Sequence, residues 1–431
     1  MGDPSANLTR IALWGFGRCG HEAKWAIEQS EPQRYEIAAI FDRNFEELNA
    51  RGETGLHIQD PNLVEELYAR GEFEGVIISI ANRYAWIEVA SKLNSLSVPV
   101  ILCEAEYASP GQFEQDPFEY ELVDSKGYET HIFKDLYLNQ TFNSYTPFVF
   151  NAEGDVNAAF IHDYQATADT IAKLYRPHPF ETVVRLQGDW CFPANIYSDN
   201  YWHFTYEVMP EVWCLEEAGY AGNYLLRWTP FAEELLGLAG IDLARVVWTR
   251  DLDVSTTYQF ERLVHVAPDA NEIRSTAPAL CRMADAIIAN LPKTDAEYPE
   301  RVFLKRTGTR RLLGADETLA RYGFVAIDPG KLSVTEQVRY LNHARIAVSP
   351  HGANSANSLY MRPGTAFIET FPINYVAPLC IYTMAERGVA YLQTVEVYGF
   401  ETPFECNPEK DYRLMPLTLE MQIENAIKLT E

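Results

Sequence analysis

Three arginines in the last third of the chain have the type and spacing of a site for a small anion. Residues 301–360 contain nine Lys or Arg against four Asp or Glu, a net of +5 in a chain whose formal charge is −26. Arg306, Arg310 and Arg311 lie at and just beyond the end of an expected strand, RVFLKR, where open parallel sheets place their ligands. Arginine binds phosphate oxygens through charge-assisted hydrogen bonds. The cluster therefore predicts a pocket for a diphosphate, such as that of a sugar nucleotide.

A turn that follows in the sequence has the features of a second half of that pocket. The apolar strand RIAV runs into SPHGANSAN at residues 349–357 and then into an expected helix with small residues in its first turns. Small residues let a diphosphate reach the free N–H groups of a helix N-terminus. The residues that we expect to bind the anion here are His351, Gly352, Ala353 and Asn354. Further along, the strand TAFIETF places Glu369 near a strand end, available to a ribose diol.

A glycine motif near the start of the chain predicts a second nucleotide site. Gly15, Gly17 and Gly20 form G-x-G-x-x-G after an expected strand and before an expected helix, and Asp42 ends the next strand. Such glycines let the backbone approach a pyrophosphate, and a carboxylate at the second strand binds ribose in NAD sites. A glycine turn that only packs helix on strand explains the same residues. The motif leaves both NAD binding and a structural turn open.

The elements that position these residues follow an alternating pattern of strands and helices. Apolar strands are expected at 10–15, 35–41, 75–80 and 98–102, with helices at 21–29, 62–70 and 84–95 between them. A similar order of strand and helix begins again near residue 300. Apolar strands that alternate with helices indicate parallel βαβ units. The sequence therefore predicts an α/β protein with a small doubly wound domain at its front.

Composition narrows the functional classes. At ~150 residues per domain, the 431 residues predict about three domains, and the 47% hydrophobic content is that of a globular protein. A charge of −26 opposes binding to nucleic acid and to anionic lipid. Seven cysteines without CxxC spacing favour reduced thiols in a cytoplasm over a zinc ribbon or disulfide scaffold. Neither a secretory signal nor an apolar run of membrane-spanning length is expected from the sequence.

Taken together, these segments resemble a known family. The stretch from FLKRTGTRRLL through SPHGANSANSLYMRPGTAFIETFP resembles the C-terminal half of glycosyltransferase family 61, with its basic run, its HGA turn and its PG…E…P strand. The resemblance extends upstream to NYWHFTYEVMP at residues 200–210, and in all it covers about 155–400. Residues 1–110 lie outside it. They are similar instead to short Rossmann-like modules in front of several sugar-modifying enzymes, which favours an accessory role.

The resemblance implies a GT-B-like pair of Rossmann-like lobes that face each other across a cleft. The expected parts are an N-terminal module (1–106), a connecting irregular or β segment (107–150), an acceptor lobe (151–295) and a donor lobe (296–431). Family members transfer a sugar from a nucleotide donor to an acceptor hydroxyl with inversion, and bacterial relatives act in capsular or other surface polysaccharide synthesis. We therefore expect a nucleotide-sugar donor, a UDP-sugar first of all, and a glycan or lipid-linked glycan acceptor.

The resemblance also places a proton-transfer pair at the acceptor side. Displacement at an anomeric carbon needs a base for the acceptor hydroxyl and positive groups for the departing diphosphate. His203 and Glu207 lie four residues apart, so they share a face of a helix. We expect Glu207 to be the base and His203 its orienter, although the two roles can be exchanged and a purely structural pair has the same spacing. Family members usually carry Asp at the second position.

Two other functions remain open from the sequence. One is an NAD-dependent, sugar-modifying oxidoreductase centred on the glycine motif; the other is a catalytically silent scaffold that binds nucleotide sugars. Asp251 and Asp253 match the DxD pattern of metal-dependent glycosyltransferases, but acidic chains produce this pattern by chance and a surface loop is the better explanation. Arginines and helix N-termini neutralise a diphosphate without a cation, so we expect neither a metal nor another required cofactor.

Overall fold

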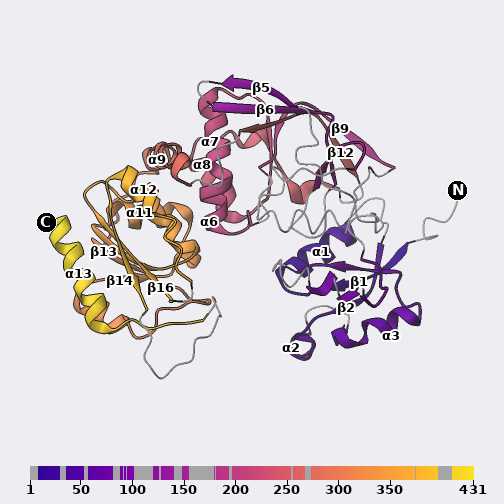
Figure 1. Ribbon diagram of the computed structural model, residues 1–431, viewed down its shortest axis with the longest axis horizontal. Helices are drawn as coiled ribbons and strands as arrows, with labels where there is room; N and C mark the ends of the chain where they lie inside the picture. Colours follow the sequence, from indigo (N-terminus) through magenta and orange to yellow (C-terminus); the bar gives the residue numbers. More distant parts are fainter. Residues whose placement is uncertain are drawn as a thin grey trace.

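The computed structural model is an α/β protein with three sheets in its described part (Figure 1). The described residues are 8–29, 35–52, 57–80, 88–100 without 91 and 94, 120–125, 128–139, 148–154, 179, 181–193, 197–253, 256–266, 273–373, 375–396 and 410–431. The N-terminal and C-terminal sheets lie at opposite ends of the view in Figure 1, with the middle sheet above and between them. The α/β class expected from the sequence is confirmed.

The N-terminal sheet is parallel and has the strand order β3-β2-β1-β4. Its elements are β1 (Thr9–Trp14), α1 (Arg18–Gln29), β2 (Tyr35–Phe41), α2 (Phe45–Arg51), β3 (Ile58–Gln59), η1 (Pro61–Leu63), α3 (Val64–Ala69) and β4 (Gly75–Ile78). The expected helix 84–95 and strand 98–102 fall partly outside the described residues, but Val100 makes a parallel bridge to Val76. Phe150 from the middle sheet joins the core of this module, so the two parts are packed together.

The middle lobe has a mixed sheet of eight strands, in the order β11-β10-β9-β12-β6-β5; in addition, β7 pairs with β12, and β8 pairs with β7. Its strands are β5 (Tyr120–Ser125), β6 (Tyr128–Lys134), β7 (Tyr137–Asn139), β8 (Phe148–Phe150), β9 (Val183–Cys191), β10 (Asn223–Leu226), β11 (Val246–Trp248) and β12 (Thr257–Val266). Its helices are α6 (Tyr201–His203), η3 (Phe204–Val208), α7 (Met209–Ala218), α8 (Pro230–Leu238), η4 (Leu243–Arg245) and η5 (Thr249–Asp251), and α9 (Ile273–Ala289) leads out of it.

The middle sheet has an antiparallel part. Residues 107–150 were expected as a connecting irregular or β segment, and β5 to β8 within this range are strands of the middle sheet. Only two residues separate β5 from β6, and so short a link joins antiparallel strands but not parallel ones. The middle lobe therefore combines a parallel core, β9 to β12, with an antiparallel extension, and is not a purely parallel Rossmann-like sheet.

The C-terminal lobe is a parallel sheet in the order β14-β13-β15-β16-β17. Its elements are β13 (Arg301–Leu304), α10 (Asp316–Arg321), β14 (Val325–Ile327), η6 (Pro329–Lys331), α11 (Val334–His343), β15 (Ile346–Pro350), η7 (Ala353–Tyr360), β16 (Ala366–Phe371), α12 (Ile381–Arg387), β17 (Ala390–Val395) and α13 (Pro416–Thr430). Every residue of β15 and β16 is buried, as continuous apolar strands between two helical layers must be. Ser333 caps α11 by accepting a hydrogen bond from Glu336 N.

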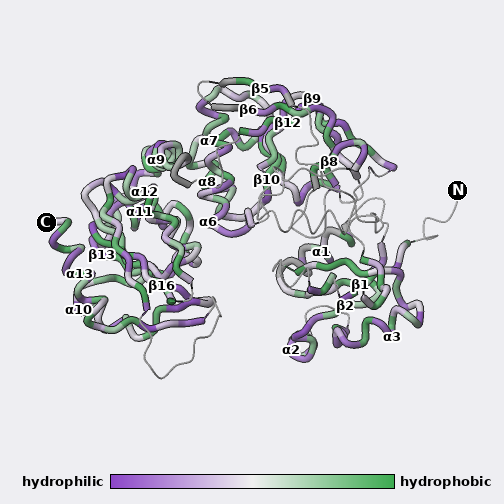
Figure 2. Tube along the Cα trace, viewed as in Figure 1, coloured by the Kyte–Doolittle hydropathy of each residue, from purple (hydrophilic) through white to green (hydrophobic). Residues whose placement is uncertain are grey.

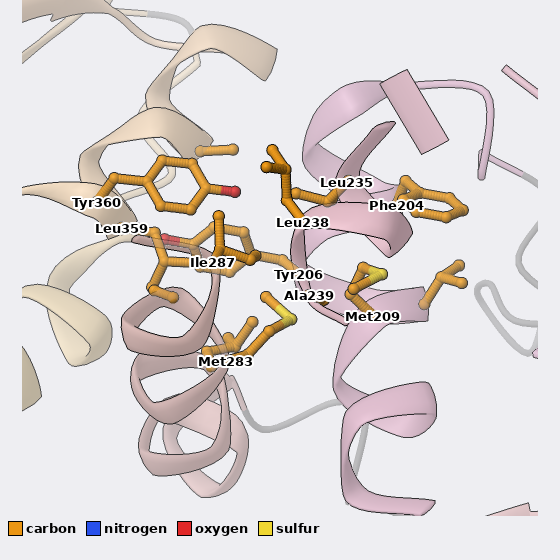
Figure 3. Packing of buried hydrophobic residues seen from close by; sticks show 14 of the residues in the cluster. Phe204, Tyr206, Met209, Leu235, Leu238, Ala239, Met283, Ile287, Leu359 and Tyr360 are labelled. Atoms are coloured by element: carbon orange, nitrogen blue, oxygen red, sulfur yellow. The ribbon is translucent and has the colours of Figure 1, made fainter. Parts of the chain in front are cut away.

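One hydrophobic core joins the middle and C-terminal lobes. Apolar side chains from both lobes and from α9 form a single buried cluster, which Figure 3 shows at close range and in which Tyr206 and Met283 lie near Leu359 and Tyr360. The hydrophobic segments in Figure 2 follow the same strands and inner helix faces. Glu234 of α8 adds a polar clamp, because its two oxygens accept from Val334 N and Thr335 N, both at 2.8 Å. None of the helices within the described ranges combines the length and apolar content needed to cross a membrane.

A buried carboxylate connects α7 to the middle sheet. Glu211 is only 4% exposed, and its Oε1 lies 2.7 Å from Nδ1 of His265 and accepts from Val266 N at 3.2 Å. Cys191 Sγ lies 3.7 Å from the same oxygen. Burial by itself lowers the pKa of His265, but the charge of Glu211 and the hydrogen bond to it outweigh burial, so the pKa is raised. The pair therefore contributes more stability when the imidazole is protonated.

Replacing His265 by Gln is expected to destabilise the protein more in acid than in base. Because the pKa of His265 is higher in the folded state, its contribution is complete below the unfolded pKa of about 6.5 and is lost as pH rises through the folded pKa. Denaturant unfolding at pH 5.5 and pH 9 measures the difference, with His343→Gln, a substitution on the outer part of α11, as the control. An equal cost at both pH values would contradict this assignment.

Candidate functional site

The turn after β15 brings the predicted anion-binding residues together. His351 N donates to Thr370 O at 2.8 Å, which holds the turn against β16. Gly352 has φ = 145°, and a Cβ at this position would collide with Nη1 of Arg306. The same Nη1 donates to His351 O at 3.3 Å. The guanidinium that follows β13 therefore lies directly on the glycine of the turn, and glycine is needed there for both conformation and space.

The helix after this turn, η7, presents small residues at its start. Ala353 and Asn354 are partly exposed, whereas the residues from Ser355 to Tyr360 are buried. Asn354 Nδ2 donates to Lys305 O at 3.4 Å, which connects the start of η7 to the end of β13. The first turn of η7 and the Arg306 guanidinium thus lie together at the carboxyl edge of the C-terminal sheet, where parallel sheets bind ligands.

Glu369 occupies a position different from the expected one. Its side chain has no exposed surface, and its two oxygens interact with Nδ1 of His351 at 2.8 Å and the hydroxyl of Tyr391 at 2.5 Å. The sequence placed it at an open strand end beside a ribose. Instead it lies beneath His351, because β16 is a central strand with a neighbour on each side. The carboxylate therefore contacts His351 and Tyr391, and it has no exposed surface with which to bind the ribose diol that the sequence assigned to it.

The three predicted arginines separate into two groups. Arg310 has φ = 57°, in the left-handed region that costs a non-glycine residue of order 1 kcal/mol. Its guanidinium lies 5.0 Å from the ring centre of Tyr375, and that ring is 5.2 Å from the ring of His351. Arg311, in contrast, donates to the carboxylate of Asp411 through both its guanidinium and its backbone N. Arg306 and Arg310 thus adjoin the turn, and Arg311 is bound to the C-terminal segment.

The predicted proton-transfer pair is in hydrogen-bond contact. His203 Nδ1 lies 2.7 Å from Glu207 Oε2, and both side chains remain partly exposed. His203 is the last residue of α6, and Glu207 lies in η3, which is a π-helix over Phe204–Val208. Such π-bulges are frequent at functional sites. The ring of Tyr197 lies 4.8 Å from that of His203, so the imidazole is held from two sides.

Two tyrosines connect this helix to the donor side. Tyr201 Oη donates to Asn357 Oδ1 at 3.1 Å, and Asn357 belongs to η7. Tyr206 Oη lies 3.1 Å from Thr383 Oγ1 of α12. Burial raises the pKa of both tyrosines, so both stay protonated. The segment that carries His203 and Glu207 is therefore attached to η7, the helix that starts at the predicted anion-binding turn.

Residues 201–368 match the family model described as Glycosyltransferase 61. This range begins at α6, includes the His203–Glu207 pair, and continues through Arg306 and the turn to the residue before Glu369. Residues 201–368 form a glycosyltransferase 61 domain.

Other comparisons add nothing to this assignment. No curated protein matches the chain. A solved structure, the holo form of Rhodotorula graminis D-mandelate dehydrogenase, covers 98% of this chain and 91% of its own at 10% identity. Its TM-score of 0.15 carries no argument about fold or function. The family match makes glycosyl transfer the activity class of this domain.

The middle lobe also contains a polar edge, inside and just before the family match, that the sequence analysis missed. Asp199 and Arg227 form an ion pair at 3.6 Å with side chains only 15% and 12% exposed. The guanidinium of Arg250 lies 3.6 Å from the ring centre of Trp228. These residues follow β9, β10 and β11, so they share the carboxyl edge of the middle sheet with the His203–Glu207 helix. The position of Arg227 and Trp228 directly after the apolar strand β10 was the available signal.

The N-terminal glycine motif, outside the family match, forms a tight turn. Gly15 has φ = 98°, and a Cβ on it would lie 2.7 Å from Ile80; one on Gly20 would collide with Gly15 O. Gly17 faces open space. Asp42 Oδ2 accepts from Phe16 N at 2.7 Å, and its Oδ1 accepts from Asn44 N. The loop itself therefore uses the carboxylate that the sequence assigned to a ribose, and nucleotide binding by this module stays a prediction.

The DxD segment and the other acidic or imidazole groups do not converge in the described part of the chain. No group of three or more His, Cys, Asp or Glu side chains with metal-binding geometry is found there. Asp251 lies 3.7 Å from Arg250, and Asp253 Oδ2 accepts from Thr256 within a turn. These contacts fit the surface loop expected for this segment.

Proposed function

We propose that this protein transfers a sugar, with inversion, from a nucleotide-sugar donor to a hydroxyl of a glycan or lipid-linked glycan. The donor that we propose first is a UDP-sugar. The supporting observation is the Tyr201–Asn357 hydrogen bond, because it joins the helix of the His203–Glu207 pair to the helix that begins at the anion-binding turn. A base and a cationic turn on two adjacent lobes are the two parts that a single displacement needs.

The proposed reaction has one displacement step. Glu207, oriented by His203, accepts the proton of the acceptor hydroxyl as its oxygen bonds to the anomeric carbon. The bond from that carbon to the phosphate oxygen breaks, and its electron pair leaves with the nucleoside diphosphate. Arg306, Arg310 and the N–H groups at the start of η7 stabilise the developing charge. These cations supply the charge neutralisation that a metal provides in DxD enzymes, so the proposed reaction uses no metal.

The wider setting is part of the same proposal. The family resemblance supports a role in capsular or other surface polysaccharide synthesis, at the cytoplasmic side where nucleotide sugars are made. The polar edge with Asp199, Arg227 and Trp228 follows strands β9 and β10 of the middle sheet and supports an acceptor site on the middle lobe.

A ligand panel tests the donor class. Thermal unfolding is measured with UDP, GDP, CDP and NAD, and nucleoside diphosphate release is measured with a panel of nucleotide sugars. The nucleoside diphosphate that the donor releases, at a concentration 100 times its Kd, stabilises the folded state by about 2.7 kcal/mol. Stabilisation by one nucleoside diphosphate together with release from its sugar conjugate supports the proposal. Stabilisation without turnover on any acceptor indicates a scaffold, stabilisation by NAD alone indicates an oxidoreductase, and loss of activity in EDTA restored by Mn²⁺ contradicts the metal-free step.

A further inference from the structure

Glu369 has an arrangement that suits holding another group in place. It lies on β16, an interior strand of the sheet, and has no exposed surface. The Tyr391 hydroxyl donates to Oε2, and Nδ1 of His351 lies at Oε1. In the register of the parallel pair, Tyr391 faces Phe367, two residues before Glu369, so both side chains lie on the same face. The carboxylate is therefore fixed at both of its oxygens.

Tyr391 is a permanent donor in this arrangement. Burial raises the pKa of the Tyr391 hydroxyl, and the charge of Glu369 raises it further, so the phenol keeps its proton. Because Tyr391 occupies Oε2, Glu369 cannot rotate away from His351 without losing a second hydrogen bond.

His351 is only 5% exposed, and its ring is held by Glu369 and two aromatic rings. The ring stacks on Phe371 with 5.0 Å between centroids and contacts Tyr375 at 5.2 Å. A carboxylate that accepts at Nδ1 requires that nitrogen to carry the proton. Within the described ranges, no side chain or backbone group bonds to Nε2 of this ring. The adjoining cation is Arg306, which donates to the carbonyl oxygen of His351 itself.

We infer that Glu369 and Tyr391 are positioning residues, which fix the His351 ring so that, with a proton on both ring nitrogens, its Nε2–H donates to a diphosphate oxygen of the donor. The inference rests on the proposed function, because the ligand is the diphosphate of a nucleotide-sugar. Two observations carry it: the doubly bonded buried carboxylate and the Arg306 guanidinium over Gly352. An anion at this turn is close to both the His351 imidazole and the Arg306 guanidinium. A neutral ligand gains no electrostatic attraction from the guanidinium.

Nitrogen NMR of the full chain labelled with ¹⁵N-histidine tests the inference. The His351 signals are assigned by their loss in His351→Gln. In the wild type we expect Nδ1 to carry the proton, and we expect pyrophosphate and UDP to shift the Nε2 signal. In Glu369→Gln, pyrophosphate should bind about 10- to 100-fold more weakly, as is usual when the group that orients a functional histidine is changed. Binding of uridine should be unchanged, because it has no phosphate.

Tyr391→Phe provides a milder variant in case the buried Glu369 substitution prevents folding. It removes one hydroxyl and leaves the carboxylate, and we expect ~3- to 10-fold weaker pyrophosphate binding. Tyr382→Phe is the matched control, since Tyr382 is a half-exposed tyrosine of the same lobe; it should bind as the wild type does.

The outcomes separate the inference from the proposed function. If UDP binds the wild type without a response at Nε2 of His351, or if both variants bind pyrophosphate within twofold of the wild type, the inference is wrong and the donor proposal stands. If neither UDP nor any other nucleoside diphosphate binds, the proposed function fails and the inference fails with it.

Discussion

Glu207→Gln is expected to slow sugar transfer by about 10²- to 10⁴-fold, the usual contribution of a general base. The amide cannot accept the acceptor proton, although it keeps the size of the side chain and a hydrogen bond to His203, whose Nδ1 lies 2.7 Å from the present carboxylate. Donor affinity should stay near that of the wild type, because the donor-side turn is on the other lobe. Initial rates and UDP binding measure the two quantities separately.

Two controls sharpen this result. Glu217→Gln makes the same change on the adjoining helix α7, in an exposed ion pair with Arg282, and should leave the rate unchanged. His203→Gln tests which member of the pair takes the proton, because the base is the residue whose replacement costs more. Near-normal transfer by both Glu207→Gln and His203→Gln would show that the pair is structural.

Arg306→Ala is expected to reduce kcat/KM for the donor by about 10²- to 10³-fold. This is the usual effect of removing one preorganised group that stabilises charge in the transition state. Arg306 lies on Gly352 and bonds to the turn. Arg311→Ala is the matched comparison: its guanidinium is bound to Asp411, so donor affinity should change by no more than about twofold. Equal losses in the two variants would show that the basic run acts only through its overall charge.

Gly352→Ala tests the same contact from the opposite side. The added Cβ would collide with the Arg306 guanidinium, and φ = 145° is unfavourable for alanine. We therefore expect donor binding to weaken to the level of Arg306→Ala. Gly364→Ala, at φ = 78° with open space around its Cβ, is the control for backbone strain alone, and it should lose stability but keep donor affinity. Full donor affinity in Gly352→Ala would contradict the geometry of the turn.

Local patterns predicted the elements and the turn correctly. The apolar runs at β13, β15 and β16 and the small residues after His351 are contiguous in sequence, so periodicity and turn chemistry are enough to find them. The i,i+4 spacing of His203 and Glu207 predicted their contact for the same reason.

Contacts between distant residues could not be predicted in this way. Arg311 and Asp411 are 100 residues apart, and nothing near either one indicates the other. The sequence predicts that Glu369 lies near the end of a strand. Its burial depends on the order of the strands in the sheet, which places β17 beside β16. β structure was among the expectations for residues 107–150, but the pairing of β6 and β7 with β12 was not predicted, because it spans more than 100 residues.

The single core shared by the middle and C-terminal lobes restricts how the chain can be divided. Opening the lobes like a hinge would expose Tyr206, Leu359 and Tyr360 to water and break the Glu234 clamp on α11. Substrates must therefore reach the site without separation of the two lobes. In a chimaera that exchanges donor specificity between two relatives, the junction has to lie before α9. This helix then comes from the same parent as the C-terminal lobe, whose α12 and η7 it packs against.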